Sequence, residues 1–188
     1  MPGELKDDKL KIMVDIETLS LSHNPAIVQI AAAPWTFEAG IQENVFSAKI
    51  DISCYKKPEF KDFDCDLDTV KWWMQQDKSA QVFSGERNIK EALQEFSDYL
   101  SQFDKKETRI WCQGASFDFP KLNYAFKVFD LPTPWLFYRE RCSRTFLELA
   151  PNIGYRPKTT HDALQDVRDQ IKNCCEAWSL MPKGQTSR

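Results

Sequence analysis

The sequence lacks the features that mark secreted, membrane-spanning or zinc-binding chains. It contains six cysteines, but none forms a Cys-x-x-Cys pair and only Cys174 and Cys175 are adjacent. This spacing favours neither a zinc site nor a secreted disulfide framework, so we expect a reduced, cytoplasmic setting. The N-terminal residues contain no apolar segment typical of a signal peptide, and no apolar run approaches transmembrane length. We therefore expect no membrane partner.

The charge balance also excludes one class of function. The net charge is −3, so the chain is not a polycation that holds nucleic acid through its overall charge, and any such binding must be local. Hydrophobic residues make up 42% of the 188 residues, enough for one compact core. We expect a single domain over residues 10–181, an N-terminal extension at 1–9, and a disordered tail at 182–188.

The hydrophobic pattern predicts strands first, and then helices that alternate with strands. Three strands joined by short loops are expected over residues 10–17, 27–37 and 44–50, as in an antiparallel meander. A further strand is expected at 109–113, and a last strand is expected to start within Trp135–Tyr138. Helices are expected at about 66–74, 88–103, 117–129, 144–149 and 163–180. This order indicates an α/β domain in which a mixed central sheet, the meander plus parallel strands, is flanked by helices.

Two acids stand at the end of the first predicted strand. Because side chains alternate along a strand, Asp15 and Glu17 share the face of Met13, and Ile12 lies on the other face. Two neighbouring carboxylates repel each other and are costly to desolvate unless a cation lies between them. A divalent metal ion, which prefers oxygen ligands, is the natural partner. A solvated strand end is the alternative explanation.

Other candidate residues lie far from these acids in the sequence. Asp118 follows the point where a predicted strand gives way to a helix, and Asp166 lies one turn into the last predicted helix. His161 precedes Asp166 by five residues, which places it before that helix and allows it to turn toward the same site. Each has an ordinary alternative: a helix cap for Asp118, a solvated side chain for Asp166, and a surface or core histidine for His161.

Together these motifs are more specific than any one of them. The chain resembles the DEDDh 3′-to-5′ exonucleases of the ribonuclease-H-like, or DnaQ-like, superfamily, over roughly residues 10–180 and at 15–18, 116–118 and 161–166. The segment Asp68–Trp73 and the pair Arg144-Thr145 are most similar to the phage and bacterial branch. One departure is Ala115, because many relatives have asparagine there. The resemblance implies a ribonuclease-H-like fold.

The resemblance also implies a chemistry and a role for each residue. Two Mg²⁺ or Mn²⁺ ions activate water and stabilise the leaving oxygen in such sites. Asp15 is expected to bridge both ions, Glu17 and Asp166 to complete one site, and Asp118 to hold the other ion. His161 is expected to act as the general base, since an imidazole titrates near neutrality. The product would be a nucleoside 5′-monophosphate, released from the 3′ end of a single strand or short overhang.

Expected substrate contacts follow from the same resemblance. Thr18 and Leu19 come directly after the first motif, where relatives hold the terminal nucleotide. Trp72 or Trp73, with Trp73 as our choice, is expected to stack on a base, and Arg144 to meet a phosphate. Core packing is the alternative for either tryptophan, and a solvated basic face is the alternative for the cationic residues Arg139, Arg141, Arg144 and Lys158. Homodimers are common among such exonucleases, so the resemblance offers a homodimer as one option, although no residue of the sequence indicates the oligomeric state.

Other functional classes remain to be weighed. A catalytically inactive nucleic-acid-binding module on the same fold is the main alternative, but such a module is expected to have lost one or more of the acids. A phosphatase with an aspartate nucleophile would have Asp-x-Asp where this chain has Glu17. A purely structural protein has no reason to carry acids at all these sites. No residue indicates whether the substrate is DNA or RNA.

Overall fold

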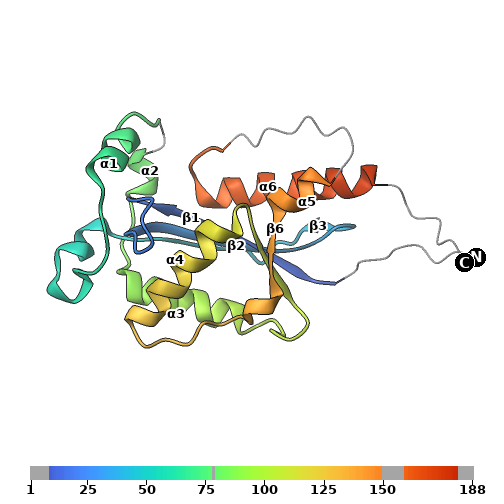
Figure 1. The fold of residues 1–188 in the computed structure, drawn as a ribbon, viewed down its shortest axis with the longest axis horizontal. Coiled ribbons are helices and arrows are strands. Elements are labelled where there is room, and N and C mark those ends of the chain that lie inside the picture. The colour runs from blue at the N-terminus through green and yellow to red at the C-terminus, as the bar shows by residue number, and fades with distance from the viewer. Residues whose placement is uncertain (1–8, 78, 150–158, 182–188) are drawn as a thin grey trace, which may run out of the picture.

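The computed structural model of the protein describes residues 9–77, 79–149 and 159–181. Apart from Lys9, the predicted N-terminal extension and the predicted tail at 182–188 lie outside the described residues. One mixed sheet forms the centre of the described chain (Figure 1). Its strands are β1 (Lys11–Thr18), β2 (Ile27–Thr36), β3 (Gly40–Ile41), β4 (Phe46–Lys49), β5 (Arg109–Cys112) and β6 (Glu140–Cys142).

The pairing of the strands confirms the predicted fold class. β2 pairs antiparallel with β1, β3 and β4, which forms the expected meander. β1 then pairs parallel with β5, and β5 pairs parallel with β6, so the strand order is β3-β2-β1-β5-β6. The carboxyl ends of β1, β5 and β6 therefore lie at the same edge of the sheet, the edge at which Asp15 and Glu17 stand.

Helices cover both faces of this sheet. α3 and α4 lie against one face and α6 against the other, while α1 and α2 lie beyond one end of the strands (Figure 1). The helices are α1 (Leu67–Trp73), α2 (Ser79–Val82), α3 (Ile89–Leu100), α4 (Ala115–Val128), α5 (Ser143–Glu148) and α6 (Ala163–Leu180). Three short 3₁₀ segments, at Ile52–Lys56, Pro58–Phe60 and Phe137–Arg139, complete the regular structure of the described residues.

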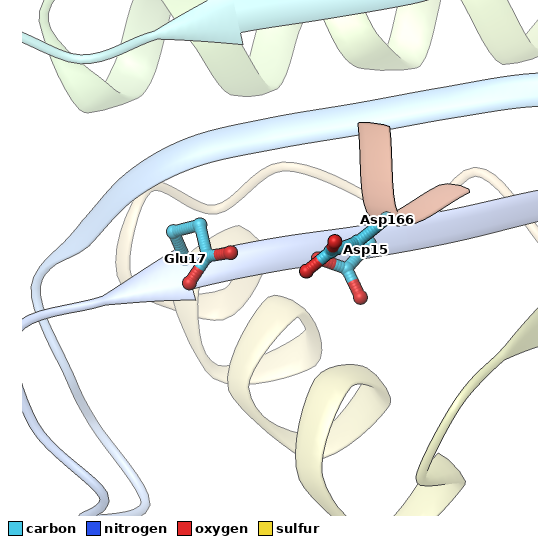
Figure 2. Close-up of side chains that lie close together, drawn as sticks. All are labelled: Asp15, Glu17 and Asp166. Atoms are coloured by element: carbon cyan, nitrogen blue, oxygen red, sulfur yellow. The ribbon is translucent and has the colours of Figure 1, made fainter. Parts of the chain in front are cut away.

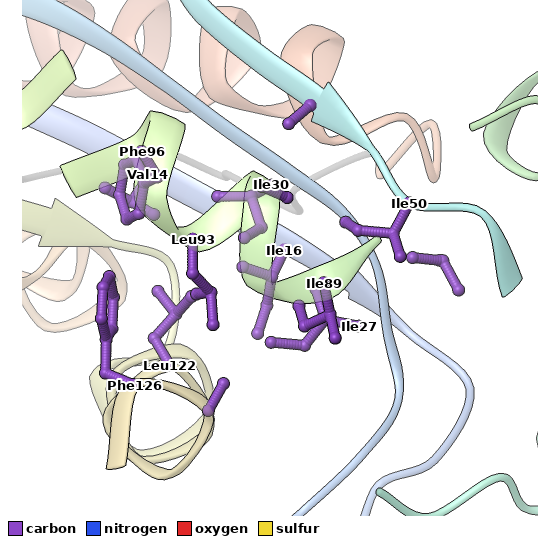
Figure 3. Close-up of a cluster of buried hydrophobic side chains, with 14 of the residues drawn as sticks. Val14, Ile16, Ile27, Ile30, Ile50, Ile89, Leu93, Phe96, Leu122 and Phe126 are labelled. Atoms are coloured by element: carbon purple, nitrogen blue, oxygen red, sulfur yellow. The ribbon is translucent and has the colours of Figure 1, made fainter. Parts of the chain in front are cut away.

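The alternation predicted for β1 divides the core into two clusters. Val14 and Ile16 pack against Leu93 of α3 and Leu122 of α4 in the larger cluster (Figure 3). Met13, on the opposite face, packs with the residues that α6 buries. This arrangement directs Asp15 and Glu17 toward the α6 side of the sheet, because they alternate in step with Met13.

Local sequence signals explain where two of the helices begin. Asp66 caps α1, and its Oδ2 accepts a 2.8 Å hydrogen bond from the Thr69 amide, which settles the choice between Asp66 and Asp68. Asn88 and Glu91 form the expected capping box at the start of α3. Both helices therefore begin where a side chain satisfies the exposed amides of the first turn.

The starts of two predicted elements differ from the structure. The last strand, expected to start within Trp135–Tyr138, begins at Glu140 as β6, because Trp135 is buried in the core and Phe137, which is 81% exposed, begins a 3₁₀ turn. The helix expected from residue 117 begins at Ala115. Gly114, with φ of 127°, turns the chain directly from β5 into α4, a conformation that suits glycine.

Candidate active site

Three carboxylates meet at the edge of the sheet. Asp15 and Glu17 come from the end of β1 and Asp166 from the first turn of α6, and each contributes one oxygen to a group whose members lie within 4.8 Å of one another (Figure 2). A buried side chain on β2 fixes where α6 begins, since Gln29 Oε1 accepts a 3.1 Å hydrogen bond from the Ala163 amide. The sequence predicted that these three acids would converge, and the structure brings them together.

The electrostatics of this carboxylate cluster are unfavourable without a cation. Burial, together with the charges of the neighbouring Asp166 and Asp118 carboxylates, raises the pKa of Glu17 to about 8. The pKa of Asp15 also lies well above its usual range because of burial and the charges of Asp118 and Glu17. No lysine or arginine among the described residues forms an ion pair with Asp15, Glu17 or Asp166. A set of oxygen donors that repel one another fits a hard divalent cation.

Asp118 supplies a fourth acid from the opposite side of the sheet. It lies in the first turn of α4 and is 4% exposed, and burial raises its pKa to about 7. It is not a member of the three-carboxylate cluster, yet its charge raises the pKa of both Asp15 and Glu17. Asp118 therefore stands beside the cluster, close enough to interact with two of its members.

The segment before α6 holds Asp166 firmly. The Thr160 amide donates to Asp166 Oδ1 at 2.6 Å, and the Thr160 hydroxyl donates to the same oxygen at 2.8 Å. The His161 amide donates to Asp166 Oδ2 at 3.2 Å. His161 reaches this position with a φ of 55°, an uncommon conformation for a residue with a side chain. As predicted, His161 precedes the helix, whose N-cap is Asp162.

A cavity of about 520 Å³ opens beside these residues. Its wall combines Glu17 and His161 with a mostly apolar lining, formed by Ile16, Thr18, Leu21, Asp66, Asp68, Thr69, Trp72, Trp73 and Phe117. The imidazole of His161 meets the Trp72 ring edge to face, with 4.6 Å between the ring centroids. The size and lining of the cavity suit a flat organic group next to a polar reaction centre.

The two tryptophans have different environments. Trp73 is 1% exposed, and its Nε1 donates a 2.9 Å hydrogen bond to the carbonyl oxygen of Thr18. Trp72 is 38% exposed. Trp73, our choice from the sequence, therefore packs α1 onto the end of β1, and Trp72 has the more accessible ring. Both line the cavity.

Of the other residues expected to contact the substrate, some line the cavity and others do not. Thr18 lines the cavity, but Leu19 is buried in the larger core cluster and is not part of the lining. Arg144 is exposed and lies outside the lining, where its Nη2 donates a 3.4 Å hydrogen bond to the Gln113 carbonyl oxygen. Lys158 lies outside the described residues. Contacts of Thr18, Leu19 and Arg144 with a substrate stay predictions.

Sequence reasoning missed several residues of this region. Phe117 and Leu21 line the cavity, although neither was among the expected contacts. Gln170 was also missed; its Nε2 donates a 2.7 Å hydrogen bond to Asp15 Oδ1. The signal for Gln170 was its position four residues after Asp166, which places both side chains on one face of a helix.

Comparison with known families agrees with this geometry. Residues 10–178 match the model of the Rv2179c-like 3′-5′ exoribonuclease domain. The chain belongs to this family. The resemblance to the DnaQ-like 3′-to-5′ exonucleases, inferred from the motifs, is thereby confirmed. No curated protein gives a significant match to the chain.

Solved structures of exonucleases share the fold. Exonuclease I of E. coli in complex with a 5cy-dA13 oligonucleotide is 13% identical, with a TM-score of 0.68 over 94% of this chain and 42% of that chain. The cell-death related nuclease CRN-4 is 12% identical, with a TM-score of 0.64 over 93% of this chain and 65% of that one. A zinc-bound complex of E. coli exonuclease I with single-stranded DNA gives a TM-score of 0.63 at 13% identity, over 87% of this chain and 39% of that one.

These matches set the extent of the similarity. The chain spans about two fifths of the length of exonuclease I, so the likeness covers only part of that protein. At such low identity the similarity establishes the ribonuclease-H-like architecture alone.

Among the helices that the structure describes, none combines the length and apolar character that a membrane crossing requires.

Proposed function

We propose that the protein is a divalent-metal-dependent 3′-to-5′ exonuclease that removes nucleoside 5′-monophosphates from single-stranded ends, with RNA as its substrate. The observation that carries this proposal is the three-carboxylate cluster, because one of its members, Glu17, lines the same cavity as His161. The choice of RNA rests on the description of the family, and the preference for single strands rests on the oligonucleotide complexes of exonuclease I.

The acidic residues fit two hard divalent cations, Mg²⁺ or Mn²⁺. We assign Asp15, Glu17 and Asp166 to one ion, and Asp15 with the nearby Asp118 to the second. When bound, such ions act as Lewis acids that favour deprotonation of the attacking water and stabilise charge on the leaving 3′ oxygen. Burial and mutual repulsion, which raise the pKa values of Asp15 and Glu17, are the physical reason for the cluster to take up cations.

His161 acts as the general base in this proposal. Its imidazole lines the cavity beside Glu17 and takes the proton of the attacking water. The hydrogen bond from its backbone amide to Asp166 ties the position of the base to that of a metal ligand. Its edge-to-face contact with Trp72 supports the ring from the other side.

The apolar part of the cavity receives the terminal nucleoside. Trp72 offers an accessible aromatic face on which a base can stack, with little dependence on base identity. Thr18 lines the same cavity as Glu17, and we assign its side chain a contact with the sugar. The terminal phosphodiester then lies against the acids and the cations that they hold.

Digestion of labelled single strands tests this function. RNA and DNA of the same sequence, each labelled at the 5′ end, are incubated with Mg²⁺, Mn²⁺ or EDTA, alone and annealed to a complement. We expect a ladder that shortens from the 3′ end, faster on single-stranded RNA, and no cleavage in EDTA. Activity that persists in EDTA, or products that shorten from the 5′ end, would contradict the proposal. Binding of strands without cleavage would favour the inactive module instead.

A further inference from the structure

A buried glutamine contacts the carboxylate that stands at the centre of the proposed metal site. Gln170 lies on α6 and is 3% exposed, and its Nε2 donates a 2.7 Å hydrogen bond to Asp15 Oδ1. Fully buried glutamine is uncommon, because each unsatisfied polar atom of its amide carries a desolvation cost. Its presence beneath the carboxylate cluster therefore requires an explanation beyond packing.

The direction of this hydrogen bond matters. An ionised carboxylate only accepts hydrogen bonds, so only the amino end of the Gln170 amide can serve it. One oxygen of Asp15 is thus fixed against α6. The other oxygen takes no part in this hydrogen bond. Because Asp166 and Gln170 are four residues apart on one helix, α6 supplies a cluster member and the donor that orients Asp15 from a single rigid element.

The second atom of the same amide has no partner among the described residues. Gln170 Oε1 is buried and accepts no hydrogen bond there. It belongs to the same amide whose Nε2 contacts Asp15 Oδ1. A buried acceptor in this position is suited to a water molecule of the cation's hydration shell, which donates hydrogen bonds.

We propose that Gln170 is a positioning residue of the metal site, which orients Asp15 through Nε2 and accepts a hydrogen bond from cation-bound water through Oε1. This inference rests on the proposed metal-dependent function. Groups that orient metal ligands in this way typically change metal affinity or activity by about 10–100-fold when they are removed. We expect the same range here, and we expect the loss to appear in cation binding without any substrate present.

Calorimetric titration with Mn²⁺ alone tests the proposal. Gln170→Met keeps the length of the side chain and removes both hydrogen-bonding atoms, and Gln170→Asn keeps the amide but is too short to reach Asp15. Both variants should bind Mn²⁺ about 10–100-fold more weakly than the parent, and added Mn²⁺ should restore most of their lost exonuclease rate. Gln165→Met is the matched control, because Gln165 also lies on α6 and donates to an aspartate, Asp169, at 3.1 Å. Its Mn²⁺ affinity should equal that of the parent.

A reference variant separates failure of this inference from failure of the proposed function. Asp15→Asn should lose most Mn²⁺ binding; if it binds Mn²⁺ like the parent, the proposed metal site itself is wrong. If Asp15→Asn loses Mn²⁺ and the Gln170 variants keep the affinity of the parent, only the role of Gln170 is refuted. Thermal unfolding in EDTA identifies a variant that does not fold. A lowered midpoint with unchanged Mn²⁺ affinity would assign Gln170 a structural role and overturn the proposal.

Discussion

The pKa of Glu17 predicts how the metal-free protein responds to pH. In the folded chain burial and the carboxylates of Asp166 and Asp118 raise that pKa from 4.5 to about 8. The folded state therefore holds a proton that the unfolded state releases more readily. Below about pH 4.5 Glu17 is protonated in both states and does not lower the free energy of unfolding. As the pH rises from 4.5 toward 8 that free energy falls, and above about pH 8 the loss caused by Glu17 is constant.

The magnitude follows from the size of the shift. Each pKa unit corresponds to about 1.4 kcal/mol, so at neutral pH Glu17 lowers the free energy of unfolding by about 3 kcal/mol. Glu17→Gln keeps the shape of the side chain and removes the charge. In EDTA at neutral pH the variant should therefore be more stable than the parent by about 3 kcal/mol, which corresponds to about 6–12 °C in the unfolding midpoint for a chain of this size.

Thermal unfolding in EDTA between about pH 5 and about pH 9 measures this effect. The midpoint of the parent should fall across the range, and that of Glu17→Gln should fall less. Glu43→Gln, which changes an exposed glutamate, should follow the parent. Saturating Mg²⁺ should stabilise the parent more than Glu17→Gln, because a ligand that binds only the folded state raises its stability. A parent midpoint that does not depend on pH, or that equals the midpoint of Glu17→Gln throughout, would show that Glu17 does not destabilise the metal-free fold through a raised pKa.

Three further predictions concern catalysis, binding and folding. His161→Ala should lose about 10²–10⁴-fold in rate with little change in Mn²⁺ affinity, and the control His23→Ala should behave as the parent. Normal turnover of His161→Ala would exclude the general-base role. Trp72→Ala should raise KM by about 5–150-fold, the equivalent of one stacked base, and Trp72→Phe should keep KM close to that of the parent. An unchanged KM in Trp72→Ala would show that no base stacks there. Gly85→Ala should destabilise the fold by about 1–3 kcal/mol, because a Cβ at this position would lie 2.4 Å from the backbone carbon of Ile50; an unfolding midpoint equal to that of the parent would show that the two segments separate easily.

The helices and strands with a clear periodic spacing of apolar residues were predictable from the sequence. The last helix was expected over 163–180, and α6 has these bounds because its apolar spacing and its cap at Asp162 agree. Only part of the convergence of Asp15, Glu17 and Asp166 followed from local rules. Alternation placed the first two on one face of a strand, whereas the resemblance to the DEDDh exonucleases implied that Asp166 joins them.

Other features depended on packing that the sequence does not display. Trp72 and Trp73 are adjacent, and the hydrogen bond from Trp73 to the Thr18 carbonyl oxygen decides which ring is buried. The apolar residues from Trp135 onward resembled a strand, but Trp135 packs among core aromatic rings and leaves no regular alternation. Gln170 offered a helical spacing from Asp166, yet only the fold brings its amide to Asp15, 155 residues earlier in the chain.

In the proposed function, the protein removes nucleotides from a free 3′ end with divalent cations held by the carboxylate cluster. The most direct measurement compares one single-stranded RNA in two forms, linear with a 3′ hydroxyl and covalently closed into a circle, each with Mg²⁺. We expect the parent to convert the linear strand into nucleoside 5′-monophosphates and to leave the circle intact, and Asp15→Asn to degrade neither. Cleavage of the circle at the rate of the linear strand would contradict the claim, as would full activity of Asp15→Asn.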